Sequence, residues 1–143
     1  MSESSPDEQA SKKDSPKKAN AIVHSHSTNA TALSTHNKKI PPFHYMVALA
    51  GGIDIKCAKY ATYGTRELSK NILKALKNRS ACLIANHGQI AFGQSLEDAF
   101  ELAEEVDNLA KQYIKAIVLG RPKLLSLNEM KKVLSKSKTY KRG

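Results

Sequence analysis

The alternation of apolar and polar positions predicts strands and helices that follow one another along the chain after residue 20. Four short apolar runs have the length of strands: 21–26, 55–61, 81–86 and 89–93. Helical spacing of apolar residues marks five segments: 28–35, 44–50, 65–77, 95–119 and one that starts at Ser126. Because strands and helices both need an apolar partner surface, this order predicts an α/β fold with helices packed on a sheet.

The longest predicted helix begins at Ser95 and ends at Gly120. Ser95 and Asp98 are spaced like a capping box, although aspartate stands where glutamate or glutamine is usual. The apolar stripe of this helix comprises Leu96, Ala99, Phe100, Ala103, Val106, Leu109, Ala110, Tyr113 and Ile117. We expect the stripe to face the sheet and to bury Phe100, Val106 and Tyr113.

The two ends of the chain differ from its middle. Residues 1–20 are rich in Ser, Lys, Asp, Glu and Pro and lack apolar periodicity, so we expect them to be disordered. The net charge of +10 is concentrated at the other end, because residues 121–143 hold eight basic and one acidic side chain, a net +7. That tail has no interleaved aromatic residues, so we interpret it as a solvated helix face and expect no nucleic-acid partner.

Membrane and disulfide classes do not fit this sequence. No apolar run approaches the length of about 18 residues that a bilayer span requires, and the polar N-terminus has no apolar signal core. We therefore expect no membrane partner and a cytoplasmic location. Cys57 and Cys82 each lie in an apolar stretch and are predicted to be buried, reduced thiols.

Three histidines sit where predicted strands end. His24 and His26 close the first run, and His87 follows the run at 81–86. Residues two apart in a strand point to the same side, so His24 and His26 can share one metal ion. A third imidazole from a neighbouring strand completes the ligand pattern of a catalytic zinc. From spacing alone, a metal site and three unrelated histidines at strand ends both remain open.

Several longer blocks resemble the class II, zinc-dependent sugar-phosphate aldolases, and most closely their fuculose-phosphate branch. The blocks are NAIVHSH at 20–26, IPPFHYMVALAGG at 40–52, YATYGTRELS at 60–69, ALKNR at 75–79 and LIANHG at 83–88. The similarity runs to about residue 140. It implies a three-layer class II aldolase-like domain over residues 21–143, with a central, mainly antiparallel sheet covered by helices.

The resemblance also implies an activity and roles for particular residues. Family members cleave a sugar 1-phosphate, here L-fuculose 1-phosphate, to dihydroxyacetone phosphate and lactaldehyde. His24, His26 and His87 match the ligands of Zn²⁺, and Tyr45 matches a proton donor that reaches into a neighbouring subunit's site. The resemblance therefore implies a homotetramer. Two further aromatic residues match positions that shape the substrate site: Tyr63 and Tyr140.

The N-terminal part departs from the family pattern. The family's catalytic glutamate ends a Ser-Ser-Glu motif, and counting back from His24 puts its place near Ser4 and Ser5, where Pro6 follows instead. Glu3 and Glu8 are out of register. The domain therefore looks N-terminally truncated, with a weak aldolase activity or none. A noncatalytic oligomerising module and a pentulose-phosphate epimerase or dehydratase remain as alternatives.

Overall fold

A computed structural model describes the backbone of residues 19–140 and the side chains of residues 19–137. Most of the segment predicted to be disordered, residues 1–18, lies outside this part. One sheet has the strand order β1-β4-β3-β2. Its strands are β1 (Ala21–Ser25), β2 (Cys57–Ala58), β3 (Ala81–Ile84) and β4 (Gly88–Gly93). Since β4 is antiparallel to both neighbours and only β2 is parallel to β3, the predicted mainly antiparallel sheet is confirmed.

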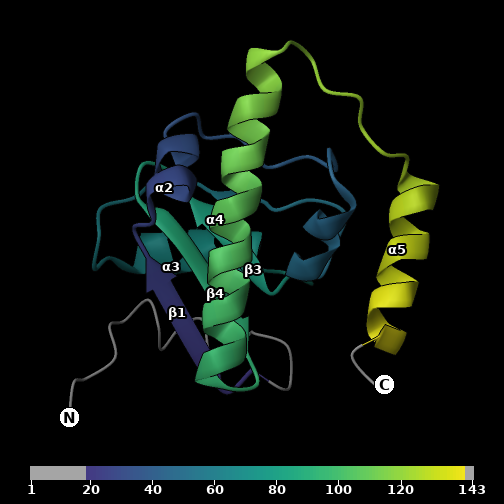
Figure 1. The fold of residues 1–143 in the computed structure, drawn as a ribbon. Coiled ribbons are helices and arrows are strands. Elements are labelled where there is room, and N and C mark those ends of the chain that lie inside the picture. Colours follow the sequence, from purple (N-terminus) through teal and green to yellow (C-terminus); the bar gives the residue numbers. More distant parts are fainter. Residues whose placement is uncertain (1–18, 141–143) are drawn as a thin grey trace.

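Helices cover both faces of the sheet, as the three-layer prediction requires. On one face lie α4 (Leu96–Val118) and α2 (Thr28–Ser34), and α4 crosses the front of the sheet in Figure 1. On the other face lies α3 (Arg66–Ala75), whose Leu68 and Ile72 are buried against β3 and β4. Alternate residues of β3 serve the two faces: Leu83 packs in the α4-side cluster and Cys82 in the α3-side cluster.

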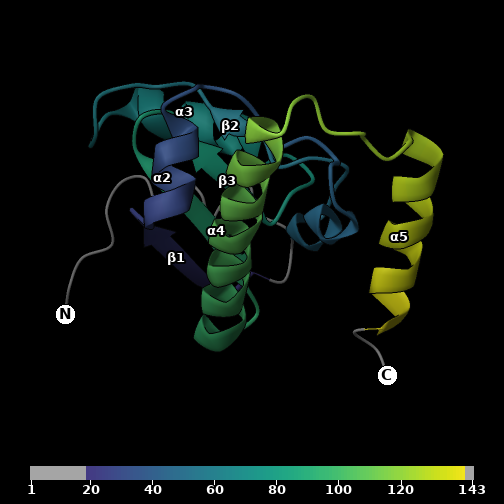
Figure 2. The ribbon, with the colours of Figure 1, turned by 45° about the horizontal axis from the view of Figure 1, so that its top comes forward.

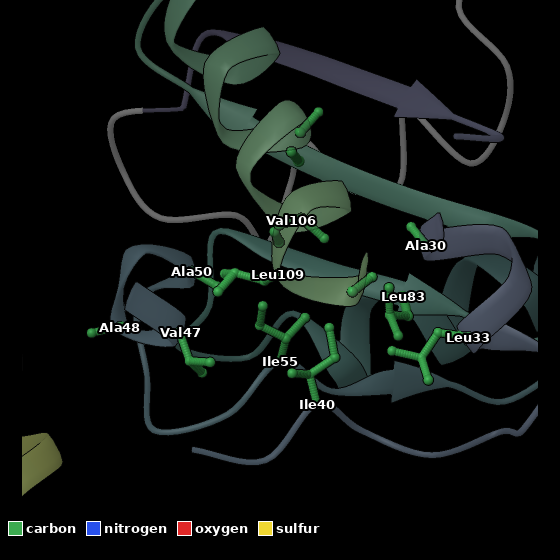
Figure 3. Close-up of a cluster of buried hydrophobic side chains, with 14 of the residues drawn as sticks. Ala30, Leu33, Ile40, Val47, Ala48, Ala50, Ile55, Leu83, Val106 and Leu109 are labelled. Atoms are coloured by element: carbon green, nitrogen blue, oxygen red, sulfur yellow. The ribbon is translucent and has the colours of Figure 1, made fainter. Parts of the chain in front are cut away.

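The larger core lies between α4 and the sheet. Figure 3 shows apolar side chains from α2, α4, β3 and the loops converging in it. Ile40 and Ile55 are fully buried there and also pair through two backbone hydrogen bonds of 2.8 and 3.0 Å. This pairing shortens the strand predicted at 55–61. Ile55 pairs with Ile40 and not with β3, so only Cys57–Ala58 of this segment pairs with β3.

The prediction that Phe100 is buried is wrong for the single chain. Phe100 is 54% exposed, whereas Val106 is fully buried and Tyr113 packs partly buried against the ring of Phe43 at 5.1 Å. The buried stripe runs through Ala99, Ala103, Val106 and Ala110. Phe100 is rotated about 100° from Ala99 around the helix axis, so it lies at the flank of the stripe.

The remaining elements follow the apolar pattern with small changes. The segment predicted as a helix at 44–50 is a 3₁₀ helix, η1 (Tyr45–Ala50), which ends at Gly51 in the left-handed region with φ of 94°. The last helix, α5 (Leu127–Tyr140), starts as predicted, with the N–H of Glu129 donating to the Ser126 hydroxyl at 3.1 Å. It lies beside η1, apart from the sheet (Figure 2).

The structure also bears on membrane-spanning helices and on the two cysteines. Among residues 19–140, no helix is both long enough and apolar enough to cross a membrane. Both cysteines are free thiols; Cys82 is buried as predicted, whereas Cys57 is only half-buried. Burial raises the pKa of Cys57 to about 11 and raises that of Cys82 further, so both stay protonated at neutral pH.

Candidate metal centre

The three predicted histidines come together at one end of β1. His24 lies in β1 and His26 just after it, and the antiparallel pairing of β1 with β4 brings His87 alongside, because His87 directly precedes β4. The ring centroids are 4.9–5.0 Å apart in all three pairs. Each residue offers a ring nitrogen, and these nitrogens all lie within 4.8 Å of one another. The structure therefore brings the three predicted histidines together, and their role as metal ligands stays a prediction.

Local backbone geometry explains how His87 can approach β1. Asn86 adopts a left-handed conformation with φ of 56°, and Gly88 has a φ of 156°. A Cβ atom on Gly88 would meet the carbonyl oxygen of Ser25 at 2.3 Å and the ring of His26 at 3.2 Å. Only glycine at this position lets β4 start so close to β1, which places the rings of His26 and His87 next to each other.

The donor set suits a zinc ion. Three imidazoles with an open side toward solvent are the ligand set of catalytic zinc, which binds histidine nitrogen at about 2.0–2.1 Å. His24 and His26 are exposed and His87 is half-buried, so the cluster is open to solvent. Within residues 19–140, the cluster contains no Asp or Glu. The described part of this cluster thus offers three imidazoles that could hold a metal ion, without a carboxylate among them.

The aromatic residues suggested by the resemblance lie elsewhere. Tyr45 begins η1, which lies between α4 and α5 in Figure 1. The residue is 55% exposed, and its ring stacks on that of His44 at a centroid distance of 4.9 Å. Tyr63 is 81% exposed, in the turn before α3. Tyr140 is the last residue of α5, and its side chain lies outside the described part. Their roles remain predictions.

Sequence reasoning missed the polar groups that surround the ligand-bearing segments. Asp107 of α4 accepts hydrogen bonds from the first turn of α2, and Gln89 of β4 is fully buried while bonding to Ser27. A signal was present, because Asp107 adjoins the apolar stripe of α4 and Gln89 interrupts a buried strand. Such polar residues at apolar positions need partners, which can lie far away in the sequence.

Comparison with known proteins identifies the family. A family model described as the class II aldolase and adducin N-terminal domain matches residues 14–114. The chain belongs to this family. It therefore shares its domain with class II aldolases and with adducin, as the family description says.

Relatives within the family are named for different sugar phosphates. The chain is 50% identical over 123 residues to the L-fuculose phosphate aldolase of Escherichia coli K12, covering 85% of this chain and 57% of that protein. It is 49% identical over 120 residues to the 5-methylthioribulose-1-phosphate/5-deoxyribulose-1-phosphate aldolase of Rhodospirillum rubrum, covering 84% of this chain and 54% of that protein. The chain thus spans little more than half the length of these relatives.

A solved structure gives the same result for the fold. An L-fuculose 1-phosphate aldolase superposes with a TM-score of 0.87 at 41% identity, covering 92% of this chain and 61% of that one. The class II aldolase fold predicted from the sequence is therefore confirmed over the part that the two chains share.

Proposed function

We propose that this chain carries the metal-binding part of a class II aldolase site, with His24, His26 and His87 holding Zn²⁺. The convergence of these three imidazoles, in a chain of the aldolase family, is the observation that supports the proposal. The reaction would be the cleavage of a sugar 1-phosphate between two carbons, releasing dihydroxyacetone phosphate and an aldehyde. Cleavage of L-fuculose 1-phosphate would yield lactaldehyde as the aldehyde.

The histidines would bind the metal, and Tyr45 would donate a proton. A zinc ion held by the three histidines would supply Lewis acidity toward negative charge on the substrate oxygens. As neutral ligands, the three imidazoles would hold the ion without cancelling its positive charge. Tyr45 would serve as a proton donor, and its exposure on η1 suits a role in a neighbouring subunit's site. We therefore propose a homotetramer, located in the cytoplasm, in which Tyr63 and Tyr140 help to shape the substrate site.

The substrate would be one of the ketose phosphates for which the relatives are named. Relatives of similar identity are named for L-fuculose phosphate and for 5-methylthioribulose 1-phosphate. Both molecules give dihydroxyacetone phosphate on aldol cleavage and differ in the aldehyde part. We propose L-fuculose 1-phosphate as the first substrate to test, because the blocks at 40–52 and 60–69 resemble that branch.

A second candidate function is a noncatalytic module on the same domain. It is favoured by the lack of a carboxylate in the histidine cluster within residues 19–140. The sequence near Ser4 and Ser5 also lacks the expected glutamate. An aldolase needs a group that exchanges a proton with the substrate carbon, and such groups are worth about 10²–10⁴-fold in rate.

A cleavage assay separates the two candidates. The purified chain is loaded with zinc and given each ketose phosphate, and dihydroxyacetone phosphate is measured by its coupled reduction. We expect slow, zinc-dependent cleavage, below the rate of about 1 s⁻¹ at which typical enzymes begin. Tyr45→Phe should lower it by a further factor of about 10² because a proton donor is lost.

Two results would contradict this account of the activity. A rate of about 1 s⁻¹ or more would show that an acid–base group is present after all, with Glu3 or Glu8 as the first candidates. No zinc-dependent product from either substrate would contradict aldolase activity in this chain and favour the noncatalytic module. A Tyr45→Phe variant as active as the unaltered chain would remove Tyr45 from the mechanism.

A further inference from the structure

Helix α2 connects the two chain segments that bear the histidines. Its first residue, Thr28, follows His26 by two positions. Its last residue, Ser34, is fully buried and bonds to the segment of His87: the N–H of Asn86 donates to the Ser34 carbonyl at 3.1 Å. The N–H of His87 donates to the Ser34 hydroxyl at 3.4 Å. The position of α2 therefore affects both His26 and His87.

The N-terminus of α2 is capped by a residue of another helix. Ser27, at the N-cap position, makes no side-chain capping bond within α2. Instead Asp107 of α4 accepts from the N–H of Asn29 at 3.0 Å, from the N–H of Ala30 at 2.8 Å and from the Asn29 side-chain amide at 2.8 Å. A carboxylate at a helix N-terminus satisfies donors that lack partners within the helix and interacts favourably with the helix dipole.

The pKa of Asp107 agrees with this capping role. Partial burial alone would raise the pKa of the carboxyl group. The hydrogen bonds from Ala30, Asn29 and Ser27 outweigh burial, so the pKa lies below its ordinary value. Asp107 is therefore ionised at neutral pH and accepts these hydrogen bonds as a carboxylate.

Gln89 of β4 also bonds to the N-terminus of α2, through Ser27. Its side chain is fully buried, and its amide donates to the Ser27 hydroxyl at 2.9 Å and to the Ala103 carbonyl of α4 at 2.8 Å. In the strand register Gln89 is also the partner of Ser25. The residues on both sides of His26, Ser25 and Ser27, are thus fixed by β4 and α4 together.

We propose that Asp107 is a positioning residue for the metal centre, although it does not touch the metal or the substrate. It ties α2 to α4, and α2 sets the spacing between His26 and His87. The inference rests on the proposed zinc site. Removing a group that orients metal ligands without binding the metal commonly lowers metal affinity by about 10–100-fold. Without Asp107, the first turn of α2 would be free to shift, and metal binding would have to order it again.

The test measures zinc affinity by competition with a chelating dye. We expect Asp107→Ala to bind Zn²⁺ about 10–100-fold more weakly than the unaltered chain. Asp107→Asn keeps an acceptor oxygen and should recover part of the loss. The matched control is Thr65→Ala, which removes the N-cap of α3, where the N–H of Leu68 donates to the Thr65 hydroxyl at 3.3 Å. It should leave zinc affinity unchanged within about twofold, because α3 bears no ligand.

A spectroscopic readout separates positioning from general loss of stability. The visible absorption of bound Co²⁺ reports ligand geometry and should change in Asp107→Ala but not in Thr65→Ala. Equal zinc affinity in Asp107→Ala and the unaltered chain would overturn the inference, and so would an equal loss in Thr65→Ala. If Asp107→Ala does not fold, Ser27→Ala replaces it: weaker zinc binding supports the inference, and unchanged binding overturns it.

The inference and the proposed zinc site can fail separately. If the unaltered chain does not bind zinc, both are wrong. If the unaltered chain and Asp107→Ala bind zinc equally well, the zinc site stands and only the role of Asp107 is wrong.

Discussion

Replacing His87 with alanine is expected to weaken zinc binding by more than 100-fold while leaving the fold intact. His87 contributes one of three ring nitrogens, and its side chain is only half-buried in the turn before β4. A ligand that binds only the folded state stabilises it by about 2.7 kcal/mol at 100 times its dissociation constant. Zinc should therefore raise the melting temperature of the unaltered chain and have no such effect on His87→Ala.

The matched control is a histidine outside the cluster. His36 is exposed just after α2, so His36→Ala removes an imidazole from the same region without removing a ligand. It should keep the zinc affinity and the zinc-dependent rise in melting temperature. If His87→Ala kept zinc affinity within a few-fold of the unaltered chain, the three-histidine site would be wrong.

The second large effect concerns the buried ion pair between Asp54 and Arg79. Arg79 donates to the Asp54 carboxylate at 2.7 Å and to the Asp54 backbone carbonyl at 3.1 Å, and Lys39 donates to the same carboxylate at 3.1 Å. The side chains of Asp54 and Arg79 are only 6% and 13% exposed. Removing one partner of a buried pair costs about 3–5 kcal/mol. We therefore expect Asp54→Asn to lower the free energy of unfolding by about 3 kcal/mol in denaturant titrations at pH 7.

The stability contributed by the Asp54 carboxylate should depend on pH. Burial would raise the pKa of Asp54, but the hydrogen bonds and charges of Arg79 and Lys39 lower it below the ordinary value of 3.8. A lowered pKa in the folded state gives stability that is present above the unfolded value and lost as the pH falls through the folded value. The difference between Asp54→Asn and the unaltered chain should thus shrink in acid below about pH 4.

An exposed carboxylate serves as the control for the ion pair. Glu104 lies on the solvent side of α4, and Glu104→Gln should change the free energy of unfolding by less than about 0.5 kcal/mol. A loss in Asp54→Asn no greater than that in Glu104→Gln would show that the pair contributes little net stability.

Local patterns in the sequence were enough to predict most elements of the fold. Apolar spacing located α3 and the buried strand β3, and Thr65 and Ser95 mark helix starts that the structure caps with their hydroxyls. The histidine cluster was also predictable, because residue spacing along β1 and one strand pairing suffice to bring the rings together. Both kinds of prediction depend on neighbours in sequence or on a single pairing.

Features that depend on distant packing could not be predicted in the same way. The exposure of Phe100 depends on which side of α4 meets the sheet. Gly52 follows the end of η1, where a turn explains a glycine, yet its main constraint is Arg79, whose guanidinium carbon would lie 2.2 Å from a Cβ atom there. Asp107 bonds to residues 77 and 78 positions away. The local spacing of apolar residues does not predict contacts between residues so far apart in the sequence.

The most direct test of the metal centre is X-ray absorption at the zinc edge of the zinc-loaded chain. The account predicts a first shell that includes three imidazole nitrogens at about 2.0–2.1 Å. His24→Ala, His26→Ala and His87→Ala should each lose this signal together with stoichiometric zinc. A shell with sulfur at about 2.3 Å, or with a single imidazole, would contradict the three-histidine site and the aldolase mechanism proposed from it.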